Sequence, residues 1–256
     1  KGFKVDFMDR DDQPMTEFYY RTARTAAKYK LLIDFHGAFK PAGLNRTYPN
    51  VVNFEGVNGL EQLKWADTSV DQVTYDTQIP FIRQAAGPMD YTQGAMLNAV
   101  KERYRPVYSE PMSQGTRCHQ LGLYMILESP LSMLCDSPTN YLELGGPCTD
   151  FIAQVPTVWD ETVVLMGKIG EYIVTARRSG ETWYIGGITN WNARNVEIPT
   201  AFLGQGNWKM ISFVDGKNAH RRASDYAYRT DGTLKAGETL KLHMAPGGGF
   251  AIKLQK

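Results

Sequence analysis

The sequence has 256 residues, of which 43% are hydrophobic and 21% are charged, as in ordinary folded proteins. This balance excludes an intrinsically disordered chain. The formal net charge is +1 and the basic residues are spread along the chain, so no nucleic-acid-binding face is predicted. No apolar run reaches the length of about 18 residues that a membrane span needs, and the first residues do not resemble a signal peptide.

The three cysteines indicate neither a disulfide framework nor a zinc site. Cys118, Cys135 and Cys148 are few, odd in number and not in CxxC spacing. They therefore do not indicate a cellular compartment.

The first half of the sequence alternates short apolar runs with stretches of helical period. The chain begins at Lys1, without an initiator Met, and enters a predicted strand at once, Gly2–Met8. A helix is predicted from Pro14 to Lys28, because apolar residues recur there at intervals of about 3.6 residues. Further strands are predicted at 31–36 and 51–55. This alternation is typical of parallel β/α units.

The same alternation continues to about Asp160. A helix is predicted over 71–84, a strand over 87–91, a helix over 114–127 and a last strand over 131–135. The first half thus supplies about four or five strands, fewer than a closed barrel of eight requires. An open doubly wound sheet is the structural alternative, but no strand is followed by a GxGxxG or GxxxxGK[ST] phosphate-binding motif.

From about Glu161 the pattern changes to short β-rich runs separated by turns. The turn signals are Ser179-Gly180, Asp215-Gly216 and Asp231-Gly232. The predicted strands lie at 172–176, 182–186, 208–214, 240–244 and 250–254. We therefore predict a small antiparallel β-sandwich over 161–256, after an α/β domain over 1–160.

Acidic side chains recur at or just after the predicted strand ends of the first half. They are Asp6, Asp34 with His36, Glu55 with Glu61, and Asp90. Side chains at the carboxyl ends of parallel strands converge on one pocket, so we expect these groups to lie close together. The glycines between Glu55 and Glu61 predict a loop that can bring both acids to the same place.

Several carboxylates in one cleft can divide their roles. One can stay ionised as a nucleophile or base, another can act as an acid, and others can hold a hard cation. Glycoside hydrolysis uses this division, and four aromatic residues are candidates for stacking on sugars: Tyr48, Trp65, Tyr91 and Trp159.

Each of these residues also has a simpler interpretation when it is taken alone. Asp6 is as typical of a turn or cap, or of a pair with Arg10, as of catalysis. His36 is typical of a hydrogen-bonded structural histidine, and most aromatic residues of such a domain belong to its core.

Taken together, several segments closely resemble glycoside hydrolase family 97, whose members act on α-glucosides or α-galactosides. The resemblance covers essentially the whole chain. The segments that carry it are 4–12, 34–50, 53–61, 87–94, 108–117, 155–160 and 245–250.

The resemblance implies a fold in which an N-terminal β-sandwich-like domain, a (β/α)8 barrel and a C-terminal β domain follow one another. This chain would then be the later portion of the barrel followed by the last domain, with the N-terminal half of the enzyme missing. The resemblance also suggests a periplasmic or secreted location.

The resemblance further implies the roles of individual residues. Asp6 matches the nucleophile of the retaining branch, whereas Gly37 stands where inverting members carry a base glutamate. Glu61 matches the general acid/base, and Glu55 matches a calcium ligand, with Glu61 also in the calcium shell. The candidates for contacts with sugar hydroxyls are Lys4, His36 and Asp90.

The expectation is therefore a retaining α-galactosidase that forms a covalent intermediate on Asp6 and uses calcium. An α-glucosidase of the same mechanism and an inactive carbohydrate-binding chain remain the alternatives.

Overall fold

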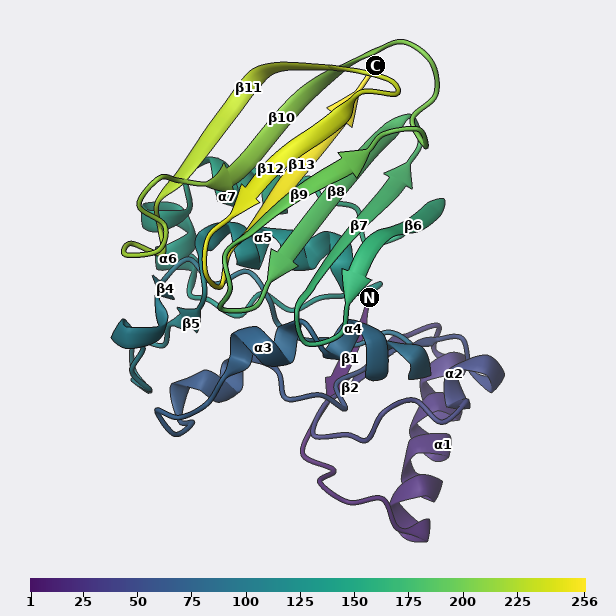
Figure 1. Ribbon diagram of the computed structural model, residues 1–256. Helices are drawn as coiled ribbons and strands as arrows, with labels where there is room; N and C mark the ends of the chain where they lie inside the picture. The colour runs from purple at the N-terminus through teal and green to yellow at the C-terminus, as the bar shows by residue number, and fades with distance from the viewer.

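The computed structural model describes all 256 residues (Figure 1). The sheet of its first half consists of three short parallel strands. They are β1 (Gly2–Val5), β2 (Leu32–Phe35) and β3 (Val51–Phe54), and they pair in chain order. The register sets Lys4 opposite Asp34, and Asp34 opposite Asn53. The residues that follow these strands consequently emerge at one edge of the sheet.

The helix α1 (Gln13–Lys28) packs on this sheet, as its periodicity predicts. Asp12 caps its first turn by accepting a hydrogen bond from the Met15 amide. Pro14 lies in this first turn, where a backbone amide would have no partner within the helix. The ring of Tyr19 is fully buried, with its centroid 4.6 Å from that of Phe35. This apolar contact fixes the helix against the strands that lead to the acidic residues.

The remainder of the first half is built from short elements. The predicted helix over 71–84 is wrong as a single helix, because the chain breaks near Pro80 into separate turns. The short helices are α2 (Leu44–Thr47), α3 (Gln72–Asp76), α4 (Ile79–Ile82), α6 (Pro138–Asn140) and α7 (Pro147–Ile152), with 3-10 segments at Leu60–Lys64, Gln84–Ala86 and Lys101–Arg103 and a π-helical turn at Tyr141–Gly145. A minor parallel pair joins β4 (Asn98–Ala99) to β5 (Ser113–Gln114).

The strands predicted over 87–91 and 131–135 do not form. The amides of Met89 and Asp90 donate to isolated carbonyls of Glu128 and Phe54, and the amide of Met133 donates to the side chain of Asp90. Such scattered partners give no regular ladder. The first half thus has parallel β/α character in three principal strands, and its assignment to a (β/α)8 barrel still rests on the resemblance.

The second half is an antiparallel structure, as predicted. Six strands pair in the order β11-β10-β13-β8-β7-β6, and β9 pairs with β12 as a separate ribbon (Figure 1). Apolar residues of both sheets, including Ile198 and Phe250, share one core. The strands are β6 (Glu161–Lys168), β7 (Tyr172–Ser179), β8 (Thr182–Thr189), β9 (Arg194–Pro199), β10 (Asn207–Asp215), β11 (Tyr226–Lys235), β12 (Thr239–Met244) and β13 (Gly249–Gln255).

Two of the predicted turn signals had different outcomes. Gly180 has φ of 58° between β7 and β8, which confirms the turn there. Asp231-Gly232 is not a turn, because Gly232 lies inside β11 opposite Met210, where the pairing register shifts. Such a glycine marks a bulge in the strand.

The helix α5 (Arg117–Ile126) joins the two halves by lying directly against β8 and β13. The contact is so close that a Cβ atom on Gly122 would lie 2.8 Å from the carbonyl oxygen of Gly187. Thr116 caps the start of the helix, and its hydroxyl accepts from the His119 amide and donates to Oδ1 of Asp215. The second half is therefore docked onto the first by a helix of the first.

Candidate active site

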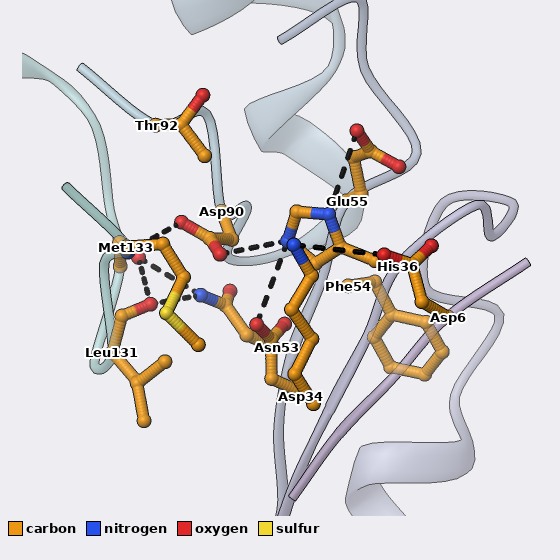
Figure 2. A network of polar contacts seen from close by, with 12 residues as sticks. Asp6, Asp34, His36, Asn53, Phe54, Glu55, Asp90, Thr92, Leu131 and Met133 are labelled. Atoms are coloured by element: carbon orange, nitrogen blue, oxygen red, sulfur yellow. Dashed lines mark hydrogen bonds and ion pairs between the residues drawn. The ribbon is translucent and has the colours of Figure 1, made fainter. Parts of the chain in front are cut away.

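One buried imidazole lies among three acidic side chains at the edge of the parallel sheet. His36 directly follows β2 and is 1% exposed. Its Nε2 lies 2.7 Å from Asp90 Oδ2 and 3.5 Å from Asp34 Oδ2, and its Nδ1 lies 3.5 Å from Glu55 Oε1 (Figure 2). Of the acids predicted to converge, Asp34, Glu55 and Asp90 do lie together around His36.

The electrostatics of this cluster favour a charged histidine. Burial opposes that charge, but hydrogen bonds with Asp90 and Glu55 and the nearby carboxylates outweigh it and raise the pKa of His36 to about 10. Burial and the charge of Asp90 raise the pKa of Asp34 to about 7. Burial acts in the same direction on Glu55, yet hydrogen bonds from His36 and the Gly37 amide prevail and lower its pKa. Glu55 is thus held as an anion.

The backbone at Gly37 explains why no side chain stands there. Its φ is 55°, and a Cβ atom would lie 2.9 Å from the amide nitrogen of Phe7 and 3.0 Å from an oxygen of Asp9. The loop that follows β1 and carries Asp6 fills this space. A glutamate at position 37 is consequently incompatible with the present course of the Asp6 loop.

Asp6 lies at the end of β1 and remains accessible to solvent. Its side chain is 29% exposed, its Oδ1 accepts from the Phe7 amide, and its Oδ2 lies 3.6 Å from the Lys4 ammonium. The neighbouring Phe7 and Asp9 both have positive φ, which shows a sharply bent backbone after the strand. Asp6 is therefore presented on a tight loop and paired with a single cation.

Glu61 lines a cavity of about 330 Å³ together with Lys4 and Thr92. Its Oε2 pairs with the Lys64 ammonium at 3.7 Å. Glu55, Glu61 and His36 each bring one potential ligand atom within 4.8 Å of the others. The loop between the two glutamates thus brings them together, as its glycines suggest, and Lys4 connects Asp6 to the cavity that Glu61 lines.

Arg83 fixes the loops that carry these acids, and no sequence pattern singled it out. Its guanidinium is buried and donates to five backbone carbonyls, those of residues 54, 55, 56, 87 and 88. Burial without a carboxylate partner lowers the pKa of Arg83 to about 10. One side chain therefore ties the Glu55 loop to the segment that leads into Asp90.

The structure separates the four aromatic candidates for sugar stacking. Tyr91 is fully buried and its hydroxyl donates to Asp76, so it belongs to the core and the prediction for it is wrong. Trp159 packs edge-on against Tyr184 in the second half, and Tyr48 packs beside α1. Trp65, in contrast, is 49% exposed and follows the residues that line the Glu61 cavity.

Comparisons with known proteins decide the family. The model of "Glycoside hydrolase 97" matches residues 1–57, and that of "Glycosyl-hydrolase 97 C-terminal, oligomerisation" matches residues 158–255. The chain is 64% identical, over 255 residues, to the retaining alpha-galactosidase of Bacteroides thetaiotaomicron, and the match covers 100% of the chain. The chain belongs to glycoside hydrolase family 97.

Two further proteins agree with this assignment. The probable retaining alpha-galactosidase of Streptomyces bingchenggensis is 34% identical over 98% of the chain. A family 97 enzyme from Pseudoalteromonas sp. strain K8, solved in complex with panose, superposes with a TM-score of 0.83 at 34% identity over 96% of the chain. The chain spans 36% to 38% of the length of these three proteins.

No helix in this family 97 chain is both long and apolar enough to cross a membrane.

Proposed function

We propose that the chain carries the catalytic carboxylates of a retaining α-glycoside hydrolase that acts on α-galactosides. The observation that carries this proposal is the 64% identity to a retaining alpha-galactosidase along the whole chain, with Asp6 and Glu61 both present. The geometry supports it, because Lys4 pairs with Asp6 and also lines the cavity that holds Glu61.

The proposed reaction proceeds by two displacements. A carboxylate oxygen of Asp6 attacks the anomeric carbon while Glu61 gives its proton to the departing glycosidic oxygen. Glu61 then takes a proton from water, whose oxygen attacks the same carbon and releases Asp6. Retaining glycosidases hold the two carboxyl groups about 5 to 5.5 Å apart, whereas inverting enzymes leave roughly 6.5 Å or more.

Lys4 gives the cavity a polar group for binding the sugar, and the buried His36 lies within 4.8 Å of Glu61, which lines the same cavity. His36 is fixed by Asp90 at 2.7 Å, and Lys4 lies between Asp6 and the cavity. We assign Lys4, His36 and Asp90 to hydroxyl contacts, because charged donors and acceptors held rigidly by neighbours select among sugar epimers.

The carboxylate oxygens of Glu55 and Glu61 are ligands of the kind that a calcium ion binds. Calcium prefers carboxylate oxygens and takes about 6 to 8 oxygen ligands. Glu55 is held ionised and lies close to Glu61, so these two side chains would supply part of such a shell. When bound, the cation would hold the Glu55 and Glu61 carboxyl groups in fixed positions. Calorimetric titration of calcium against the protein and Glu55→Gln would test this assignment.

Replacing Asp6 by Gly tests the mechanism directly. Turnover of nitrophenyl α-galactoside should fall by at least about a thousandfold, because the nucleophile is lost. Azide should restore activity and yield the β-configured galactosyl azide, since it enters from the face that Asp6 occupied. Asp11→Gly, an exposed acid in the same loop, is the matched control. Near-normal activity of Asp6→Gly would refute the assignment.

The same assay separates the proposal from its rivals. Preferential cleavage of nitrophenyl α-glucoside would indicate an α-glucosidase of the same mechanism. Sugar binding without cleavage of either substrate would indicate a carbohydrate-binding chain.

A further inference from the structure

Two large aromatic side chains lie exposed beside each other near the Glu61 cavity. Trp65 is 49% exposed and Tyr108 is 71% exposed. Their ring centroids are 6.0 Å apart and their planes are inclined by 31°. Burial stabilises large aromatic side chains. Trp183 and Trp208 are only 4% and 3% exposed, whereas Trp65 and Tyr108 lack this stabilisation. Such a pair is characteristic of a binding surface.

The pair borders the cavity through its neighbours in the chain. Trp65 follows Lys64, and Tyr108 precedes Pro111 by three residues; Lys64 and Pro111 both line the cavity. The indole of Trp65 is held by a hydrogen bond to the Gln62 side chain at 2.7 Å. The two rings thus lie beside residues that line the cavity containing Glu61, and the Trp65 ring is fixed there.

The Lys64 ammonium links the rings to the acid. It lies 4.4 Å from the ring centroid of Trp65, 5.5 Å from that of Tyr108 and 3.7 Å from Glu61 Oε2. A single cation therefore contacts both aromatic surfaces and the carboxyl group that would protonate the departing oxygen. The aromatic pair lies on the Glu61 side of the cavity.

We infer that Trp65, Tyr108 and Lys64 bind the leaving-group sugar of an oligosaccharide substrate. This inference rests on the proposed function, in which the leaving group departs beside Glu61. The carbon-bound face of a pyranose can pack on the two rings, while its hydroxyls can accept hydrogen bonds from Lys64. The chain would then select substrates with a second sugar over those with a small leaving group.

The test compares two substrates that differ only in the leaving group. α-Galactosyl fluoride releases a single atom, whereas an α-galactosyl disaccharide releases a sugar. Trp65→Ala should lower the ratio of kcat/KM for the disaccharide to kcat/KM for the fluoride about tenfold, and Tyr108→Ala about threefold. Trp65→Phe should keep most of the ratio, and Tyr29→Ala, which removes a 72% exposed ring beyond α1, should not change it.

Each other outcome has a distinct meaning. An equal loss on both substrates would overturn the inference, and an accompanying drop in Tm would indicate that the rings stabilise the fold instead. If the variants stay active and the ratio of the two kcat/KM values does not change, the inference is overturned but the proposed function is not. If the unsubstituted protein cleaves neither substrate, the proposed function itself fails.

Discussion

The Thr116 hydroxyl lies 2.6 Å from Oδ1 of Asp215 and joins the first turn of α5 to the end of β10. Oδ2 of the same carboxylate accepts hydrogen bonds from the amides of Ala245 and Gly249. Burial outweighs these hydrogen bonds and raises the pKa of Asp215 to about 6. A titrating group therefore sits where the two halves of the chain meet.

The raised pKa of Asp215 predicts a pH dependence of stability. Between about pH 4 and pH 6 the folded chain binds this proton more tightly than the unfolded chain does, so its contribution to stability falls as pH rises, by about 3 kcal/mol in all. Asp215→Asn keeps hydrogen-bonding capacity without the titration and should remove this part of the slope, measured by urea unfolding at successive pH values. Asp215→Ala should instead lower stability throughout. An unchanged slope in Asp215→Asn would contradict the assigned pKa.

The close approach of α5 to the six-stranded sheet predicts a strict requirement for glycine. A Cβ atom on Gly186 would lie 2.5 Å from the carbonyl oxygen of Gly122 and 2.8 Å from Cβ of Met125. Gly186→Ala should therefore cost about 1 to 3 kcal/mol and lower the Tm by roughly 5 °C. Gly204→Ala is the matched control, because only the end of the Lys256 side chain lies near that position. Equal Tm values for the two variants would show that the helix can move away at little cost.

The five carbonyl contacts of Arg83 predict a loss of both stability and activity on substitution. Arg83→Met leaves these buried carbonyls without a donor and should cost about 3 to 5 kcal/mol in the free energy of unfolding. Arg83→Lys keeps the charge but fewer donors, so its loss should be intermediate. Urea unfolding and kcat measurements check both effects, with the exposed Arg103→Met as the control. Full stability in Arg83→Met would mean that other donors replace the guanidinium.

The charge on His36 predicts an acid-dependent rescue. His36→Phe leaves Asp34, Asp90 and Glu55 facing one another without a cation and should cost about 3 to 5 kcal/mol at pH 7. Lowering the pH protonates Asp34, whose pKa is raised to about 7, so the difference in Tm from the unsubstituted protein should shrink toward pH 4. Replacing the exposed His220 by Phe is the control. A deficit that does not change with pH would indicate a packing defect rather than lost charge compensation.

The sequence predicted the grouping of those polar side chains that lie at the ends of predicted strands. The apolar runs that become β2 and β3 each end at acidic or imidazole groups, and parallel pairing alone brings Asp34, His36 and Glu55 to one edge. Asp90 also arrives there, although the strand predicted to carry it does not form. A side chain's position can thus be correct when the backbone that delivers it is irregular.

The missed features depend on tertiary contacts that hydropathy does not record. The strand β11 is largely exposed and lacks apolar alternation, so its extended form is imposed by pairing with β10. Arg83 resembles any surface arginine in sequence, and only the fold surrounds it with carbonyls. Tyr91 is buried because it packs in a core formed by separate segments, where its hydroxyl donates to Asp76.

The glycine contacts between α5 and the sheet leave the two halves no room to slide past each other. A protease cut in the linker between α7 and β6 should therefore yield a nicked particle that stays together and melts in one transition. A lone β-domain, once separated, would present the uncovered strip of sheet where the helix had been and would be prone to precipitate.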